Sequence, residues 1–206
     1  ESLKLGQSGQ VPNLTFEVVT SGTSGLWTSR ATPADNSWYN IAWSPELGLF
    51  AAVSYDGTGN RVMTSPDGIV WETQASAADN QWVGIAWSPE LGLFAAVSTA
   101  TADTSNRVMT SPDGIVWTAQ ATPAGKVWGS IAWSPELGLF AAVGQGDTAG
   151  QRVMTSSNGT TWVSQTTPAD NWWNDIAWSP ELGLFAAIAN TGVGNRVMTS
   201  SNGSTW

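Results

Sequence analysis

Three kinds of side chain that could bind or react recur once in each of several similar segments of the chain. Repeated arginines could hold a carboxylate or sulfate, repeated glutamates could bind a metal or act as paired acids, and an aromatic ring beside amides could hold a sugar. The repeated positions are Arg61, Arg107, Arg152 and Arg196; Glu46, Glu90, Glu136 and Glu181; and Trp38, Trp82, Trp128 and Trp173.

The chain is poorly supplied for catalysis. It has no histidine, no cysteine and only two tyrosines, Tyr39 and Tyr55. One glutamate per segment does not place two acids side by side, as glycoside hydrolysis requires, and it does not gather several oxygen ligands around a metal. We therefore predict that the protein is not an enzyme and has no catalytic residue, metal site or cofactor. The repeated glutamates are interpreted as solvated turn residues.

The four arginines stand at the same position in each segment, at the start of an expected strand. Arginines related in this way more often bridge to loop carbonyls or to a neighbouring carboxylate than bind a ligand. They remain ligand candidates because a ring of guanidinium groups could also present forks to an anionic ligand.

Tryptophan is the strongest candidate for ligand contact. Tryptophan recurs at several positions of the repeat, and we call the equivalent residues at one such position a row. The rows that contain Trp43 and Trp71 are interpreted as packing core. The row of Trp38 lies where a variable loop enters a strand, and core packing competes there with a carbohydrate platform. The candidate ligand residues from this region are the ring positions Trp38, Trp82, Trp128, Trp173 and Trp172, and the preceding amides Asn36, Asn80 and Asn171.

These side chains belong to a unit that the chain repeats in tandem. The phrase IAWSPELGLFAAV begins at Ile41 and returns three times, with the last copy ending in Ile, and RVMTSPDGIVW begins at Arg61 and also returns three times in similar form. The closing tryptophans are spaced by 46, 45 and 44 residues (71 to 117, 117 to 162 and 162 to 206). Such a period indicates one supersecondary unit whose copies pack on one another.

Each unit predicts four short antiparallel strands, joined by tight turns at SPELG and at SPDG or SSNG. The predicted fold is therefore all-β, a β-propeller of four-stranded blades. A five-bladed ring is preferred, and a larger ring is the alternative. The expected parts are an N-terminal arm or linker (1–16), a partial blade (17–34) and full repeats (35–78, 79–124, 125–169 and 170–206). We expect the ring to be open within these residues and closed by the arm, further sequence or a partner chain.

One turn resembles a known propeller motif. Ser65, Asp67, Gly68 and Trp71 are similar to the Asp-box (BNR) pattern, although one residue between Asp and Gly is missing and Asn replaces Asp in the last two copies. In that family the motif forms the hairpin between the outer two strands and is structural. The layout is also similar to that of propeller lectins of the tachylectin type, without a shared motif.

The loops divide into a constant set and a variable set. The SPELG turn is identical in all four copies, whereas the loops between units and the loops between the second and third strands differ in sequence and length. Because antiparallel strands alternate in direction, the two variable sets emerge on one face of the ring. We expect this variable-loop face to carry repeated, equivalent ligand pockets.

Composition limits the partners. The net charge of −9 argues against nucleic acid and against an anionic membrane surface. Low charge with abundant Thr, Ser, Gly and Trp favours an extracellular, virion-surface or cell-surface location. The first functional hypothesis is a non-enzymatic carbohydrate-binding module. The alternatives are a structural or display component of a virion, appendage or surface assembly, and a designed or recently amplified propeller without a ligand.

Overall fold

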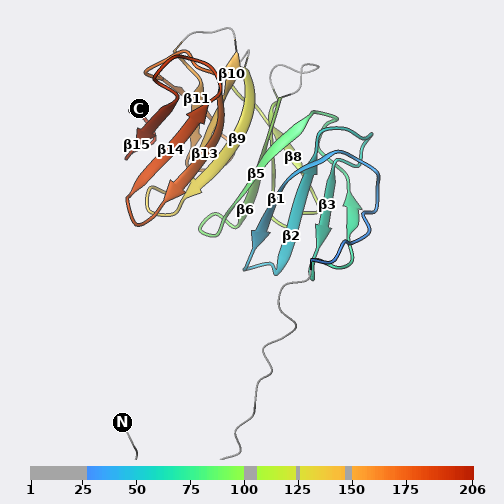
Figure 1. The fold of residues 1–206 in the computed structure, drawn as a ribbon. Coiled ribbons are helices and arrows are strands. Elements are labelled where there is room, and N and C mark those ends of the chain that lie inside the picture. Colours follow the sequence, from blue (N-terminus) through green and yellow to red (C-terminus); the bar gives the residue numbers. More distant parts are fainter. Residues whose placement is uncertain (1–26, 100–105, 124–125, 147–149) are drawn as a thin grey trace, which may run out of the picture.

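A computed structural model describes residues 27–99, 106–123, 126–146 and 150–206, and these form fifteen β-strands in four antiparallel sheets (Figure 1). No helix that could cross a membrane occurs in the described ranges. The all-β fold with four-stranded blades is confirmed, with three strands described in the last blade. The arm and most of the partial blade, residues 17–26, lie outside the described residues.

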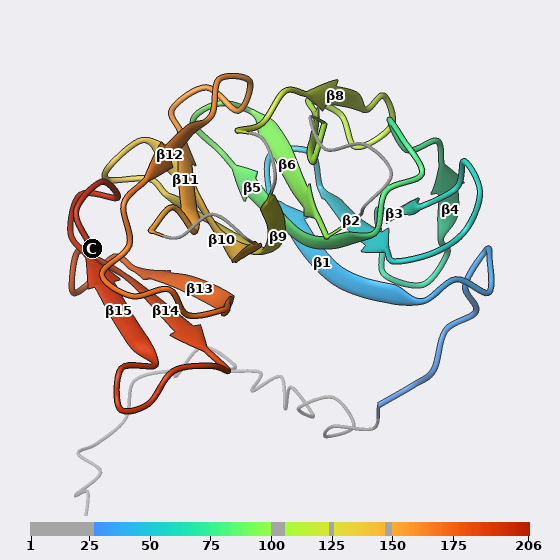
Figure 2. The same cartoon turned by 90° about the horizontal axis from the view of Figure 1, so that it is seen from above.

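Each sheet is one blade, and its strands pair in sequence order. The blades are blade 1, with β1 (Trp38–Ser44), β2 (Leu49–Ser54), β3 (Val62–Ser65) and β4 (Glu72–Gln74); blade 2, with β5 (Trp82–Ser88), β6 (Leu93–Ser98), β7 (Val108–Ser111) and β8 (Thr118–Gln120); blade 3, with β9 (Lys126–Ser134), β10 (Leu139–Gly146), β11 (Val153–Ser156) and β12 (Val163–Gln165); and blade 4, with β13 (Trp173–Ser179), β14 (Leu184–Ala189) and β15 (Val197–Ser200). Figure 2 shows the four blades in this order along an open arc.

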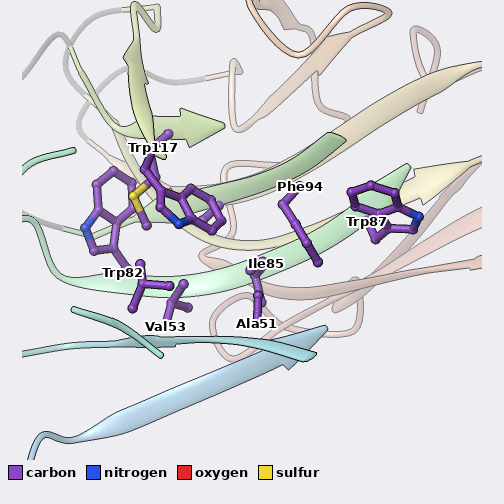
Figure 3. Packing of buried hydrophobic residues seen from close by; sticks show 10 residues of the cluster. Ala51, Val53, Trp82, Ile85, Trp87, Phe94 and Trp117 are labelled. Atoms are coloured by element: carbon purple, nitrogen blue, oxygen red, sulfur yellow. The ribbon is translucent and has the colours of Figure 1, made fainter. Parts of the chain in front are cut away.

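The core lies between the blades. Each blade has a front face toward the preceding blade and a back face toward the following one. Between blades 1 and 2, the back face gives Ala51, Val53 and Val62, and the front face gives Ile85 and the aromatic rings drawn in Figure 3. The equivalent residues form the next two interfaces. Burial on both faces explains why the strands are apolar with little alternation.

A β-bulge at the start of each innermost strand sets the direction of its side chains. In blade 2, Trp82 pairs with Ser98 but Gly84 pairs with Val97, so Val83 is the extra residue. The same shift occurs in the other three blades. A bulge breaks the two-residue alternation of a strand. As a result Trp82 and Ile85, three positions apart, both pack into the front-face core.

The constant SPELG turns join neighbouring blades. Glu46 Oε2 accepts a hydrogen bond of 2.6 Å from Trp87 Nε1 of the next blade, and the same bond is 2.7 Å from Trp133 to Glu90 and from Trp178 to Glu136. The interpretation of these glutamates as merely solvated is therefore wrong for three of the four. The invariant SPELG turn of one blade and the invariant tryptophan of the next blade are thus the acceptor and the donor of one repeated hydrogen bond.

The outer hairpin of each blade is held by one short side chain. Asp67 Oδ1 accepts hydrogen bonds from the backbone N–H groups of Val70 (3.0 Å) and Ile69 (2.8 Å), while Gly68 adopts a φ of 69° that favours glycine. Asn158 Oδ1 makes the equivalent two bonds in blade 3. The Val70 and Ile69 amides lower the pKa of Asp67, and the Val116 and Ile115 amides lower that of Asp113.

These lowered pKa values predict an acid-dependent loss of stability. Both carboxyls have folded-state pKa values below their ordinary 3.8, so their contribution is complete above that value and is lost as the pH falls through the folded pKa. The D67N/D113N variant keeps the turn bonds, as Asn158 and Asn202 do. We expect its melting temperature to fall less steeply than that of the wild type from about pH 4 to about pH 2, measured by circular dichroism. Parallel curves would contradict this account.

Candidate functional site

A hollow of about 530 Å³ opens where the innermost strands of all four blades meet the variable loops. Its described lining residues are Tyr39, Tyr55, Gln81, Val83, Thr99, Val127, Gly129, Gln145 and Asn174. We call this the central hollow. The hollow lies on the variable-loop face, where ligand pockets were expected. The expectation was one equivalent pocket per blade, whereas in this hollow the blades contribute different residues to one shared space.

The bulges place one residue from each blade in this hollow. The extra residue of each bulge is Tyr39, Val83, Gly129 or Asn174, and all four line the hollow. Bulges commonly re-aim a side chain at a functional site. Since the four bulge residues differ, the repeated backbone presents a site that has no internal symmetry.

Blade 1 supplies two tyrosines that lie together. The ring centroids of Tyr39 and Tyr55 are 6.0 Å apart with planes tilted by 30°, and the residues are 65% and 38% exposed. Asp56 braces the loops that carry them, because its two carboxylate oxygens accept 2.7 Å bonds from Ser37 N and Ser37 Oγ. The hydrogen bond from the Ser37 amide is the main cause of the lowered pKa of Asp56. The aromatic pair is thus held in place while its ring surface stays accessible.

The rest of the described lining combines the apolar Val83 and Val127 with uncharged polar side chains. Gln145 Nε2 donates to Asn174 Oδ1 at 3.0 Å, and Thr99 Oγ1 donates to Gln81 Oε1 at 3.3 Å. These amides and hydroxyls offer donors and acceptors next to an aromatic surface. No charged side chain occurs among the lining residues that the structure describes. The described lining thus combines an aromatic surface with hydrogen-bonding groups, the features by which a binding pocket orients a ligand.

The tryptophan row proposed as a sugar platform is core. Trp82, Trp128 and Trp173 are fully buried between blades, so no ring surface is left for a ligand. Trp38 is half-buried and lines a separate apolar hollow at the end of the arc. The bulge explains the error, because it turns these rings into the interface between blades.

Trp172 has a different environment from that row. Its side chain is exposed (48%) beside the variable loops, and its backbone N–H donates to Thr191 Oγ1 at 2.7 Å. It is absent from the residues that line the central hollow. Trp172 is therefore an exposed aromatic on the same face that can serve as a control for contact outside the hollow.

The predicted amide residues brace loops rather than face a ligand. Asn80 Nδ2 donates to Asn106 O at 2.7 Å, and Asn171 Nδ2 donates to Asn195 O at 2.7 Å, with both asparagines buried. Asn36 Nδ2 makes the equivalent bond to Asn60 O at 3.0 Å. Each bond ties the loop before the first strand to the loop before the third strand. The structure thus gives these asparagines a loop-bracing role, and none of them is among the described lining residues of the central hollow.

The arginines join neighbouring blades at the variable loops. Arg61 donates to Gly57 O (2.8 Å) and to Asn80 O (2.8 Å), and its Nε lies 3.6 Å from Asp79 of the next blade. Arg152 is buried and lies near Asp170 in the same way. Arg107 is also buried, and Arg196 Nε donates to Gly192 O at 2.7 Å. The bridging interpretation is confirmed for Arg61 and Arg152, and no arginine lines the described part of the central hollow.

Changing Arg61 to Gln should affect stability. Because the side chain is 13% exposed and bonds loop carbonyls of two blades, we expect a loss of about 1.5–3 kcal/mol in the free energy of unfolding, measured by urea denaturation. The control is R30Q, an exposed arginine, with an expected change within about 0.5 kcal/mol. Equal stability of the two variants would argue against the bridging role.

The residues that line the central hollow are not among the ligand candidates predicted from the sequence, although the sequence carries a signal for them. Tyr39, Val83, Gly129 and Asn174 occupy one repeat position with four different residues, directly after an invariant tryptophan. Tyr55, Thr99 and Gln145 form a second such position. Both positions lie in the segments recognised as variable. In a repeat protein, the positions that differ between copies were the better guide to the site.

The described residues hold no cluster of three or more acidic side chains arranged for a metal ion. No protein-family model and no curated protein sequence matches this chain.

The fold is nevertheless shared with solved propeller structures. A chain of the nidogen/laminin complex matches with a TM-score of 0.56 and 13% identity, covering 74% of this chain and 59% of that one. A GH74 enzyme of Niastella koreensis matches with a TM-score of 0.56 and 18% identity, covering 82% of this chain and 23% of that one. A chain of the mitotic checkpoint complex matches with a TM-score of 0.58 and 17% identity, covering 81% of this chain and 48% of that one. This chain thus spans less than two thirds of each, and the likeness shows the fold alone.

Proposed function

We propose that this protein is a non-enzymatic carbohydrate-binding module whose site is the central hollow. The observation that carries the proposal is the exposed Tyr39–Tyr55 pair beside the uncharged side chains of Gln81, Gln145 and Asn174. A sugar ring needs a flat apolar surface for its C–H face and donors and acceptors for its hydroxyls. The size of the hollow, about 530 Å³, suits a short oligosaccharide.

The ligand class follows from the charge of the lining. A sialylated or sulfated glycan would need a cation near its anionic group. The buried Arg107 and Arg152 and the loop-bound Arg61 lie outside the described lining. We therefore propose a neutral saccharide. An extracellular, virion-surface or cell-surface location fits such a ligand and is part of the proposal.

Absence of catalysis is proposed on the same chemistry. Hydrolysis of a glycoside requires a general acid placed against a second carboxyl group. Asp56, the carboxylate next to Tyr55, is held by two hydrogen bonds from Ser37, and its lowered pKa keeps it ionised. An ionised carboxylate of this kind is not a proton donor at neutral pH.

The proposal is tested with the intact chain on an array of neutral and acidic glycans, followed by calorimetric titration with the free saccharides. We expect neutral oligosaccharides to bind and to be recovered unchanged by mass spectrometry after prolonged incubation. Binding of acidic glycans alone would contradict the ligand class, and cleavage of a bound glycan would contradict the non-enzymatic role. Absence of all glycan binding would favour a display role or an amplified propeller without a ligand.

A further inference from the structure

The two ends of the arc expose apolar faces that are buried everywhere between them. On the front face of blade 1, Ile41 is 51% exposed and Trp43 is 42% exposed. The same positions in blade 2 are Ile85 at 6% and Trp87 at 9%, because blade 1 covers them. Blade 1 thus has a complete front face without a preceding blade among the described residues.

The opposite end exposes the complementary face. On the back face of blade 4, Ile188 is 54% exposed and Val197 is 64% exposed. The equivalent Val53 and Val62 of blade 1 are fully buried against blade 2. The apolar character of both positions is kept in blade 4, although nothing in the described part of the chain covers them.

The blade 1 face is also shaped to receive such residues. A hollow of about 250 Å³ on it is lined by apolar side chains that include Trp38, Ile41, Met63 and Trp71. In blade 2 the equivalent positions pack around Ala51, Val53 and Val62 of the preceding blade. Ala186, Ile188 and Val197 are the corresponding group on blade 4.

The polar partners match as well. Inside the arc, each SPELG glutamate accepts a bond from the next blade's Trp Nε1, but Glu181 is bonded to Ser179 of its own turn at 3.4 Å. No carboxylate of the described residues accepts a bond from Trp43 Nε1. In blade 1, Arg61 lies near Asp79 of the next blade. Arg196 is the equivalent of Arg61 in blade 4, and Asp35 is the equivalent of Asp79 at the start of blade 1.

We propose that the two end faces bind each other between two copies of this chain, so that blade 4 of each copy docks on blade 1 of the other. The contact repeats the three interfaces already present in the chain and adds a Glu181–Trp43 bond and an Arg196–Asp35 ion pair. A head-to-tail contact forms a ring when its rotation closes. Two copies give eight blades, the upper end of the usual range of about four to eight, whereas three copies would exceed it.

Sedimentation equilibrium of the 206-residue chain tests the proposal. We expect a species of twice the 21.7 kDa chain mass. A monomer, as would result if residues 1–26 covered the end faces within one copy, overturns the proposal. A series of larger open assemblies overturns the closed two-copy ring.

Two variants identify the faces involved. I41D alters only the blade 1 face and I188D only the blade 4 face, and both residues are exposed enough in one copy to leave its own core unchanged, which circular dichroism verifies. Each variant alone should be monomeric, because both contacts of the ring are damaged. An equimolar mixture should form a heterodimer through its one unaltered contact. V116D, at a 64% exposed position on blade 2, which carries neither end face, should stay dimeric.

These variants also give the contradicting results. A dimer that persists in I41D or I188D would place the contact on another surface. A mixture that stays monomeric would show that the two end faces are not complementary. Because the readout is mass, it is independent of the proposed carbohydrate site.

Discussion

Replacing Trp173 by Ala is expected to lower the free energy of unfolding by about 3–5 kcal/mol, the usual cost of removing a large buried aromatic side chain. Trp173 is fully buried in the core between blades 3 and 4, where it packs with Val143, Val153 and Phe185. The loss should appear as a lower urea midpoint, or as failure to fold if the chain has little stability to spare.

The preceding residue supplies the matched control. Trp172 is 48% exposed, so W172A should change the free energy of unfolding by no more than about 0.5 kcal/mol. Similar losses in the two variants would contradict the assignment of the Trp173 row to the core. An unchanged stability in W173A would return this row to consideration as a ligand surface.

Replacing Tyr39 or Tyr55 by Ala is expected to weaken saccharide binding at least about tenfold, because aromatic anchors in a binding site often contribute more than about 1.4 kcal/mol. The dissociation constant is measured by calorimetric titration with a neutral oligosaccharide that binds the wild type. Both tyrosines are exposed and contact each other, so their loss should leave the cores between blades intact.

W172A again serves as the control, because it removes an exposed aromatic ring from the same face but outside the lining of the central hollow. It should bind the saccharide as the wild type does. If W172A weakened binding and the tyrosine variants did not, the site would lie on blade 4 and the proposed hollow would be wrong.

The fold was predictable because repetition makes the local signals agree. SPELG places a turn at the same point in every copy, and the apolar run from Leu49 to Ser54 returns as β6, β10 and β14. A unit of this length must bury its faces against its neighbours, which fixes the propeller class.

The role of each tryptophan row was harder to predict because it depends on a bulge. By simple alternation, Trp82 and Ile85 would lie on opposite sides of their strand. The extra residue at Val83 puts both on the front face and sends its own side chain into the hollow. A bulge of this kind leaves no clear mark in one unit of sequence, so the row of Trp82 was kept as a candidate ligand surface although it belongs to the core.

The hydrogen bond between Glu46 and Trp87 could also not be predicted from the sequence. Both residues were recognised as invariant within the repeat, but they stand 41 positions apart and in different units. Only the packing of one blade on the next shows that a turn residue of one unit accepts a bond from a strand residue of another.

Fluorine NMR of protein labelled with 3-fluorotyrosine shows directly whether a saccharide binds in the hollow between the innermost strands. The chain has only two tyrosines, and both line the hollow. Tyr39 also lines the apolar hollow on the blade 1 end face, so the Tyr55 signal is the one specific to the saccharide site. We expect both signals to shift as a neutral oligosaccharide is added, with the same saturation as calorimetry. Saccharide binding that leaves both signals unchanged would contradict the account.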